Sequence, residues 1–387
     1  MKNLIILGST GSIGTSALAV ADRFPDRLRV AGLAAGSDSE LLRAQVERYG
    51  PVSVALGNGE PGAALLRLCD SVGSRLLAGP QAVAELAAWP DGDVVVTAVV
   101  GAAGLEPTLA AVDAGKRVAL ANKEALVMAG ELVLERARRG GAEIVPIDSE
   151  HNAIFQCLQG QAPDRLRRIM LCSSGGPLLS LDEAELDGVT IEQALNHPRW
   201  DMGRKISVDS ATMMNKGLEM IEARWLFDLE PEQISVVIHP QSVVHSLVEF
   251  VDGSVLAQIG RTDMAMPIQY CLSYPERWDR SDMRLDLAAV SPLEFFEPDA
   301  ERFPALALAR EAMAAGGTAP AVLSAADEVA VEAFLEKAIP FRAVVEVVAA
   351  VLGQHKTAGR ANLQEILRAD RWAREAAREE VRRLRAG

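Results

Sequence analysis

The chain has 387 residues, of which 49% are hydrophobic and 4% aromatic, and its formal net charge is −14. This length and apolar content predict two or three domains with sizeable cores and exclude a disordered chain. The negative charge argues against nucleic-acid and anionic-membrane partners, because phosphate groups would be repelled. A small phosphorylated substrate needs only a local cluster of donors and is not excluded.

The chain also lacks the marks of a membrane or secreted protein. No stretch reaches the roughly 18 uninterrupted apolar residues of a membrane span. The N-terminal run LIIL is shorter than a signal-peptide core and breaks at a glycine-rich turn. The four cysteines are widely spaced with no CxxC pair, which favours reduced thiols. A cytoplasmic location is therefore the default expectation.

Short apolar runs alternate with helical segments through the first 149 residues. The apolar runs are NLIILG, LRVAGLAAG, DVVVTAVV, KRVALAN and AEIVPID, and helices are expected to about residue 24, near 39–49, near 104–114 and over 123–139. Apolar runs of this kind, separated by helices, are typical of a parallel sheet covered on both faces. We therefore expect an α/β protein whose residues 1–149 form a Rossmann-like, doubly wound domain.

The pattern changes after this region. RIMLCSSGG is strand-like and leads into a glycine turn, and VDG at 251–253 suits the turn of an antiparallel hairpin. We expect an α+β catalytic domain over 150–290 and a proline-punctuated connector over 291–311. The Ala/Glu/Arg-rich remainder, 312–387, is expected to form a bundle of packed helices.

The first motif with a chemical meaning is GSTGSIG at 8–14, between a strand and a helix. Backbone N–H groups in such a turn, with a helix N-terminus behind them, form a site for a pyrophosphate. The spacing GxxGxxG is less specific than GxGxxG, and a glycine turn without a ligand is the alternative. Its place in the first βα turn of a doubly wound fold favours a dinucleotide site.

The type of dinucleotide depends on the segment AAGSDSE at 34–40. An acid after the second strand usually pairs with a ribose 2′-OH and favours NAD, whereas a 2′-phosphate favours a cation. Asp38 therefore favours NAD, while Ser37, Ser39 and the helix N-terminus offer donors to a phosphate. These residues alone leave the choice open.

Two further polar groups follow strands. Asn122, Lys123 and Glu124 come directly after KRVAL, and Asp148 and Glu150 come after AEIVP. The carboxyl ends of strands are where open α/β folds bind ligands, although the first group could also be an ordinary helix start. If Asp148 and Glu150 lie in an extended segment, both point to one face. Two such carboxylates repel unless a cation lies between them, and Mg²⁺ or Mn²⁺ would neutralise them; a solvated acidic loop is the alternative.

A third oxygen ligand is available in the segment ISVDSATMMNKGLEMIEARWLF (206–227). We expect a helix from about Ala211, in which Asn215, Lys216 and Glu219 lie one turn apart on one face. An amide, an ammonium and a carboxylate could bind a phosphorylated substrate and a metal. An ordinary solvated face is the alternative.

Several other side chains could complete a site. Ser173 and Ser174 lie beside glycines in SSGGP, and Ser210 precedes the expected helix. The segment HPRWDMGRKIS (197–207) places His197 near a glycine-containing loop that could close over a ligand. His239 and His245 lie in strand-like runs and are expected to be hydrogen-bonded groups of the core or behind the site. His355 is expected at the surface, and His151 could have either role.

These motifs resemble those of 1-deoxy-D-xylulose 5-phosphate reductoisomerases. GSTGSIG, NKEALV, PIDSEHNAIFQ, SSGGP, HPRWDMGRKISVDSATMMNKGLE and IHPQSVVHS occur in the order seen in that family, over the chain to about residue 275. The resemblance implies a metal-dependent, NADPH-linked rearrangement and reduction of 1-deoxy-D-xylulose 5-phosphate to 2-C-methyl-D-erythritol 4-phosphate, in the non-mevalonate route to isoprenoids. It also implies a homodimer, formed through strands of the 150–290 domain.

The resemblance assigns roles residue by residue. The metal ligands (Mg²⁺, Mn²⁺ or Co²⁺) are Asp148, Glu150 and Glu219. The catalytic residues are Lys123, Glu150, His197 and Lys216. The substrate is bound by Lys123, Ser149, Glu150, Ser174, His197, Ser210, Asn215, Lys216 and Glu219. NADPH is bound by Thr10, Gly11, Ser12, Ile13, Gly36, Ser37, Asp38, Asn122, Glu124 and Gly203. Trp200 and Met202 belong to a mobile lid over 198–205.

Three alternatives stay open, one for the cofactor and two for the function. Ser37 and Asp38 stand where the family often carries Asn after a small or basic residue, so the margin of NADPH over NADH is expected to be narrow. A metal-dependent sugar-acid dehydrogenase would reduce without rearranging, but would have less use for the phosphate donors. A nicotinamide-sensing regulatory protein would keep GSTGSIG without three carboxylates for a metal.

Overall fold

The structure is a computed structural model that describes residues 1–290 and 292–386. Residue 291, where the predicted connector begins, and residue 387, where the predicted bundle ends, lie outside the described residues. The chain forms two compact units, 1–125 with 133–152 and 263–281, and 126–132 with 153–262 and 282–387. The three-domain division expected from the sequence stays a prediction.

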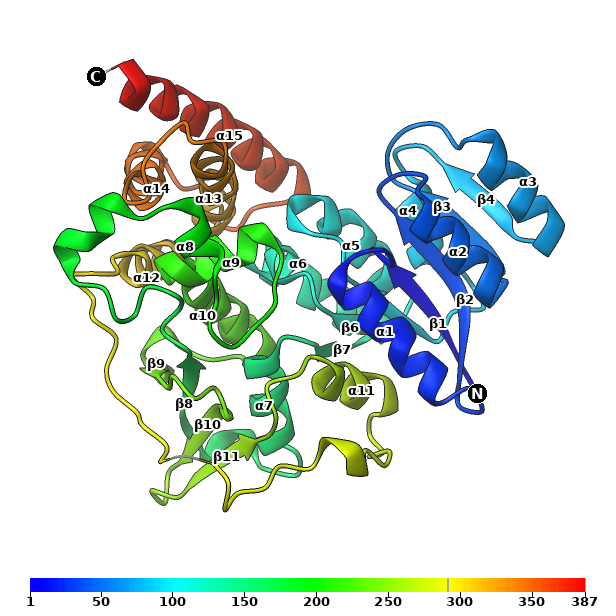
Figure 1. Ribbon diagram of the computed structural model, residues 1–387, viewed down its shortest axis with the longest axis horizontal. Coiled ribbons are helices and arrows are strands. Elements are labelled where there is room, and N and C mark those ends of the chain that lie inside the picture. Colours follow the sequence, from blue (N-terminus) through cyan, green and yellow to red (C-terminus); the bar gives the residue numbers. More distant parts are fainter. Residues whose placement is uncertain (291, 387) are drawn as a thin grey trace. The chain divides into compact units, whose positions relative to one another are not determined.

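The first unit is built on a parallel sheet (Figure 1). Its strands are β1 (Lys2–Leu7), β2 (Leu28–Ala35), β3 (Ser53–Leu56), β4 (Arg75–Ala78), β5 (Val94–Thr97), β6 (Arg117–Leu120) and β7 (Glu143–Pro146). Its helices are α1 (Ser12–Arg23), α2 (Glu40–Tyr49), α3 (Ala63–Val72), α4 (Ala82–Ala87), α5 (Leu105–Asp113) and α11 (Ala265–Ser273); α6 (Lys123–Gly140) and α7 (Ser149–Cys157) belong to both units.

The strand order is β4-β3-β2-β1-β5-β6-β7, and every pairing is parallel. Right-handed crossovers put α1, α2 and α3 on one face and α4 and α5 on the other. Consistent with this, α2 packs against α3, α1 against α11, and α4 against α5. The order reverses between β1 and β5, where open α/β sheets bind ligands. The predicted doubly wound fold is confirmed.

The second unit combines a small mixed sheet with helices. Its strands are β8 (Leu166–Ser173), β9 (Ile234–Ile238), β10 (Val244–Phe250) and β11 (Val255–Ile259), in the order β11-β10-β8-β9. β10 pairs antiparallel with β8 and β11, and β8 pairs parallel with β9. The predicted hairpin at 251–253 therefore joins β10 to β11. Strand β11 is the exposed edge of this sheet.

The helices of this unit share one apolar core with the sheet. They are α8 (Ile191–Leu195), α9 (Arg204–Thr212), α10 (Met214–Phe227), α12 (Ala305–Ala315), α13 (Ala319–Leu335), α14 (Ala343–Gln354) and α15 (Leu363–Ala386). Helix α13 is packed between α14 and α15 (Figure 1). Within residues 1–290 and 292–386, the chain has no helix that combines the length and the apolar character needed to span a bilayer.

Candidate functional site

The turn between β1 and α1 has the geometry of a nucleotide-binding turn. Gly8 adopts φ +83°, and a Cβ on Gly14 would lie 2.2 Å from the Gly8 carbonyl oxygen, so both positions require glycine. Helix α1 begins after Gly11 without a side-chain cap, which leaves its first N–H groups to a ligand. Gly11 and Ser12 are exposed there, beside the half-buried Thr10 and Ile13. The residues fit a dinucleotide phosphate.

A pair of buried side chains fixes this turn from behind. The Ser9 hydroxyl donates to Oε1 of Gln45 at 2.8 Å, and the Gln45 amide donates back to the Ser9 carbonyl at 2.9 Å. Gln45 lies on α2, so the phosphate turn is tied to the helix that follows β2. At the end of β2, Gly36 and Ser37 are exposed, while Asp38 is half-buried.

The polar triplet at the start of α6 is a tightly packed helix start. The Asn122 side chain accepts from the Ala125 N–H at 3.0 Å and donates to Glu124 at 3.0 Å. Its amide also donates to the Gly101 carbonyl at 3.0 Å. Lys123 is only 7% exposed and forms an ion pair with Asp148. The triplet is therefore an ordinary helix start, and its cap places Lys123 beside Asp148, a predicted metal ligand. Its role in binding stays a prediction.

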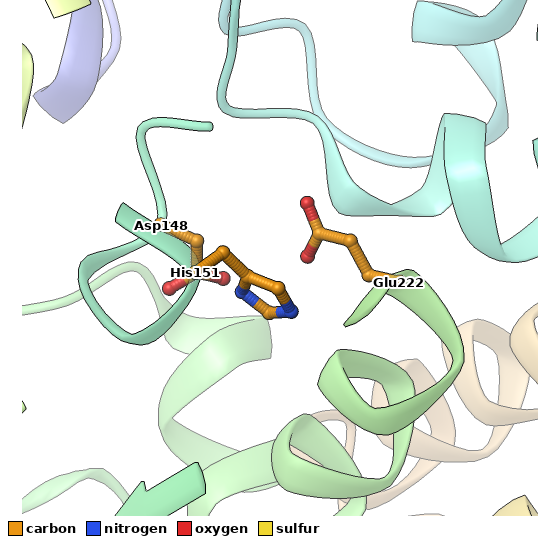
Figure 2. A group of neighbouring side chains, drawn as sticks. All are labelled: Asp148, His151 and Glu222. Carbon is orange, nitrogen blue, oxygen red and sulfur yellow. The ribbon is translucent and has the colours of Figure 1, made fainter. Parts of the chain in front are cut away.

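The expected extended arrangement of Asp148 and Glu150 is wrong. Strand β7 ends at Pro146 and α7 begins at Ser149, so Glu150 lies in the first turn of a helix. The Ser149 hydroxyl donates to Oε2 of Glu150 at 2.6 Å. His151 follows in the same turn and is fully buried (Figure 2). Asp148 therefore lies just before the helix and Glu150 in its first turn, where the helix dipole favours negative charge.

Helix α10 brings together the three side chains expected on it. The Glu219 carboxylate accepts from Asn215 and from Lys216, each at 2.5 Å. The Lys216 ammonium also donates to the Cys172 carbonyl at 2.6 Å, and Lys216 and Glu219 are 3% and 1% exposed. A buried ion pair of this kind is costly unless the lysine and the carboxylate make further hydrogen bonds, and here both do.

One acid on α10 was missed by the sequence analysis. Glu222 is 1% exposed and lies three residues after Glu219, on the same side of the helix. Figure 2 draws it on α10. The signal was present in the sequence as Glu219-x-x-Glu222, a spacing that puts two carboxylates one turn apart.

The SSGGP turn contacts His197 through Ser174. Nδ1 of His197 accepts from the backbone N–H groups of Arg199 and Trp200 at 3.1 and 3.0 Å. The neutral ring must therefore carry its proton on Nε2, which donates to the Ser174 hydroxyl at 2.8 Å. Burial lowers the pKa of His197 to about 4, so the ring is neutral at pH 7. The Ser174 hydroxyl proton is left to donate elsewhere.

The same turn lies against α9. A Cβ on Gly176 would be 2.4 Å from the Ser210 carbonyl oxygen. Ser210 lies inside α9 rather than before the helix, because the predicted single helix is two, separated at Met213 with φ 66°. Ser174 and Ser210 are both half-buried and close in the fold.

The predicted lid is anchored most firmly at its C-terminal end. Residues 196–203 form no regular structure, and Trp200 packs on His245 with ring centroids 6.3 Å apart. Met202 is half-buried, and Gly203 is the N-cap of α9. Lys205 lies inside α9 and pairs with Asp209 and the buried Asp327 at 2.7 and 3.0 Å. The mobility of the segment before α9 stays a prediction.

His239 has a structural role rather than a role in binding or catalysis. Its Nε2 accepts from the N–H groups of Val243 and Val244, each at 3.2 Å, and its Nδ1 lies 2.9 Å from the Glu294 carbonyl. The ring also stacks on Phe295. These contacts satisfy both nitrogens, so His239 is a structural group, as expected.

Comparisons with known proteins cover the whole chain. Residues 4–130 match the profile of 1-deoxy-D-xylulose 5-phosphate reductoisomerase, and residues 144–227 and 259–376 match C-terminal domains of the same enzyme. A reductoisomerase of that name from Symbiobacterium thermophilum is 52% identical over 387 residues, 99% of this chain and 100% of the relative.

Solved structures agree with the sequence comparison. A DOX-P reductoisomerase in complex with NADPH, fosmidomycin and magnesium is 43% identical, with a TM-score of 0.94 over 100% of both chains. The reductoisomerase from Zymomonas mobilis in complex with NADPH is 42% identical, with a TM-score of 0.92 over 98% of this chain and 99% of that one.

Proposed function

Because the chain belongs to the 1-deoxy-D-xylulose 5-phosphate reductoisomerase family, we propose that it converts 1-deoxy-D-xylulose 5-phosphate to 2-C-methyl-D-erythritol 4-phosphate. The reaction is a rearrangement followed by reduction with NADPH, and it feeds isoprenoid synthesis by the non-mevalonate route. The observation that carries the proposal is the pairing of carboxylates with lysines: Asp148 with Lys123, and Glu219 with Lys216.

This pairing is what a divalent-ion site needs when no ion is bound. Asp148, Glu150 and Glu219 each offer a carboxylate oxygen, the ligand type that Mg²⁺ and Mn²⁺ prefer. Each lysine pairs with its carboxylate, and with an ion bound it would be available to bind substrate oxygens. When bound, the ion supplies Lewis-acid polarisation of a carbonyl. Co²⁺ is a further candidate for the same oxygen ligands.

The substrate is proposed to meet donors from several elements. Ser174, Ser210, Asn215 and Lys216 supply hydroxyl, amide and ammonium groups suited to phosphate or hydroxyl oxygens. Lys123, Ser149 and His197 line the reacting carbons; the neutral His197 ring orients Ser174 through its Nε2–H. Trp200 and Met202 close over the ligand and exclude water from it.

NADPH is proposed to lie along the first unit. Its pyrophosphate sits on the turn formed by Thr10, Gly11, Ser12 and Ile13, where the N-terminus of α1 offers N–H groups. Gly36, Ser37 and Asp38 adjoin the adenosine ribose, as expected at the end of the second strand. Asn122, Glu124 and Gly203 complete the cofactor contacts.

Assembly and location are proposed on separate grounds. The edge strand β11 exposes Val255, Leu256 and Ile259 by 46%, 42% and 40%, and an exposed apolar edge strand favours pairing with a second copy. We therefore propose a homodimer. All four cysteines lie in the described residues and none forms a disulfide, which suits a reducing compartment such as the cytoplasm.

Turnover separates this function from the two alternatives. The protein is incubated with 1-deoxy-D-xylulose 5-phosphate and NADPH, with Mn²⁺ or with a chelator, and NADPH oxidation is followed. The proposal requires oxidation that depends on both the sugar phosphate and the ion. A dehydrogenase would oxidise NADPH with unbranched keto sugar acids instead. A sensing protein would bind NADPH without consuming it.

A further inference from the structure

Asp38, in the loop after β2, forms a charge pair with Arg43 on α2, a residue to which the proposed function gives no role. Asp38 stands at the position where an acid in a doubly wound fold binds the ribose 2′-OH of NAD. Taken alone, it would repel the 2′-phosphate of NADPH. The residues around Asp38 offset this repulsion. The inference rests on the proposed use of NADPH.

The Asp38 carboxylate is held from two sides. Its Oδ2 accepts from the Gly62 N–H at 3.1 Å, and its Oδ1 lies 3.4 Å from Nε of Arg43. A Cβ on Gly62 would approach Oδ2 to 2.6 Å, so the glycine is needed for this contact. The Asp38 side chain is 14% exposed. It is therefore fixed in the protein and neutralised by an arginine.

Arg43 lies one turn into α2, and among the described residues only one of its three guanidinium nitrogens contacts other polar groups. Its Nε donates to the Ser39 carbonyl at 3.3 Å and faces Asp38. Within residues 1–290 and 292–386, its two terminal nitrogens have no hydrogen-bond partner. The side chain is 34% exposed. The guanidinium is thus oriented through one nitrogen, with its remaining donors left to a ligand.

We infer that Arg43 is the residue that selects the adenosine 2′-phosphate, and that Asp38 is the positioning residue that orients it. The pair is neutral, so the 2′-phosphate does not meet a net negative charge. Planar guanidinium groups bind phosphate through paired N–H donors, which Asp38 cannot provide. Without Arg43, the Asp38 carboxylate would be left to accept from a ribose 2′-OH and would favour NADH.

The test measures binding of cofactor fragments, without turnover. Calorimetry with the full chain compares adenosine 2′,5′-bisphosphate with adenosine 5′-monophosphate, for the wild type, Arg43→Gln and Arg48→Gln. Arg48 is the matched control, because it lies on the same helix and pairs with Asp22 at 2.9 Å. Arg43→Gln should lower the affinity for the bisphosphate about tenfold or more and leave the affinity for the monophosphate within about twofold of the wild type. Arg48→Gln should change neither.

A second variant tests the positioning role of Asp38. Asp38→Asn keeps an oxygen for the Gly62 N–H but turns an NH2 group towards Nε of Arg43. It should weaken bisphosphate binding by about threefold or more and leave monophosphate binding within about twofold. Bisphosphate affinity in Arg43→Gln within about twofold of the wild type, or a wild type that does not prefer the bisphosphate, would overturn the inference. Either of these two outcomes is compatible with metal-dependent turnover of the sugar phosphate. The inference can therefore fail while the proposed function stands.

Discussion

The first unit makes its nucleotide turn from backbone, whereas the second makes its α10 cluster from buried side chains. The turn depends on glycines at which an added Cβ would meet backbone oxygen. The cluster depends on an ammonium and a carboxylate that are almost completely buried. A larger side chain at one of the glycines should therefore distort the turn. In the cluster, removal of one charged group should weaken binding.

The strongest loss of activity is expected when one charge is removed from the cluster. Glu219→Gln keeps one acceptor oxygen but places an NH2 group against the other of its two donors, Asn215 or Lys216, and it removes the charge of a proposed metal ligand. Turnover should fall about a hundredfold or more, with folding intact and Mn²⁺ affinity reduced. Glu379→Gln, at an exposed position of α15, is the control. Calorimetry that finds unchanged Mn²⁺ affinity in Glu219→Gln would remove this residue from the metal ligands.

The lysine of the same cluster tests substrate binding. Lys216→Met should raise the KM for the sugar phosphate by about tenfold or more and the KM for NADPH far less, since the proposed partner of the ammonium is the substrate phosphate. It should also lower the melting temperature, because Glu219 stays buried without its cation. The exposed Lys356→Met serves as control. Equal changes in both KM values would contradict the assignment.

The backbone turn is tested by adding one methyl group. In Gly14→Ala the new Cβ would meet the Gly8 carbonyl oxygen at 2.2 Å, so α1 must move away from β1. We expect a loss of about 1–3 kcal/mol in the free energy of unfolding, together with weaker NADPH binding. Gly11→Ala is the matched control for stability, because its Cβ would come no nearer than 3.4 Å to other atoms. Denaturant unfolding that finds equal stability for both variants would refute the close-packing argument.

A weaker effect is expected from the histidine that links the serine turn to the lid. Burial lowers the pKa of His197 to about 4, below the ordinary value near 6.5. A base with a lowered folded pKa stabilises the fold above its unfolded value, and this contribution is lost as the pH falls from about 6.5 towards 4. In an NMR titration, the Arg199 and Trp200 amide signals should shift with a midpoint at about pH 4. The His197→Asn variant, which lacks this titration, assigns the shift to His197. A midpoint near 6.5 would contradict the hydrogen-bond assignment.

The sequence predicted the layers of the first unit but missed β3 and β4. Each has only four residues, SVAL and RLLA, and alanine and leucine are weak strand signals without a longer apolar run. Their pairing with β2 and with each other is a tertiary effect. β5 also has four residues, but it lies in the longer apolar run DVVVTAVV. β1 and β2 lie in the runs NLIILG and LRVAGLAAG, and runs of this length were recognised.

The candidate site residues were predicted from their motifs, and their roles stay predictions, whereas their local geometry was predicted less well. Asp148 and Glu150 were expected in an extended segment, although Asp followed by Ser and Glu is a helix-start signal. The pairing of Lys123 with Asp148 and the contact of Asp38 with Gly62 each join segments that follow neighbouring strands of the sheet. No periodicity in the sequence reports such contacts.

The proposed function requires one protein both to rearrange and to reduce the sugar phosphate. Carbon NMR of the product formed from ¹³C-labelled 1-deoxy-D-xylulose 5-phosphate, with NADPH and Mn²⁺, observes both steps at once. We expect the branched skeleton of 2-C-methyl-D-erythritol 4-phosphate, with one NADPH consumed for each sugar and no product when the ion is chelated. A reduced sugar phosphate with its original unbranched skeleton would contradict this function.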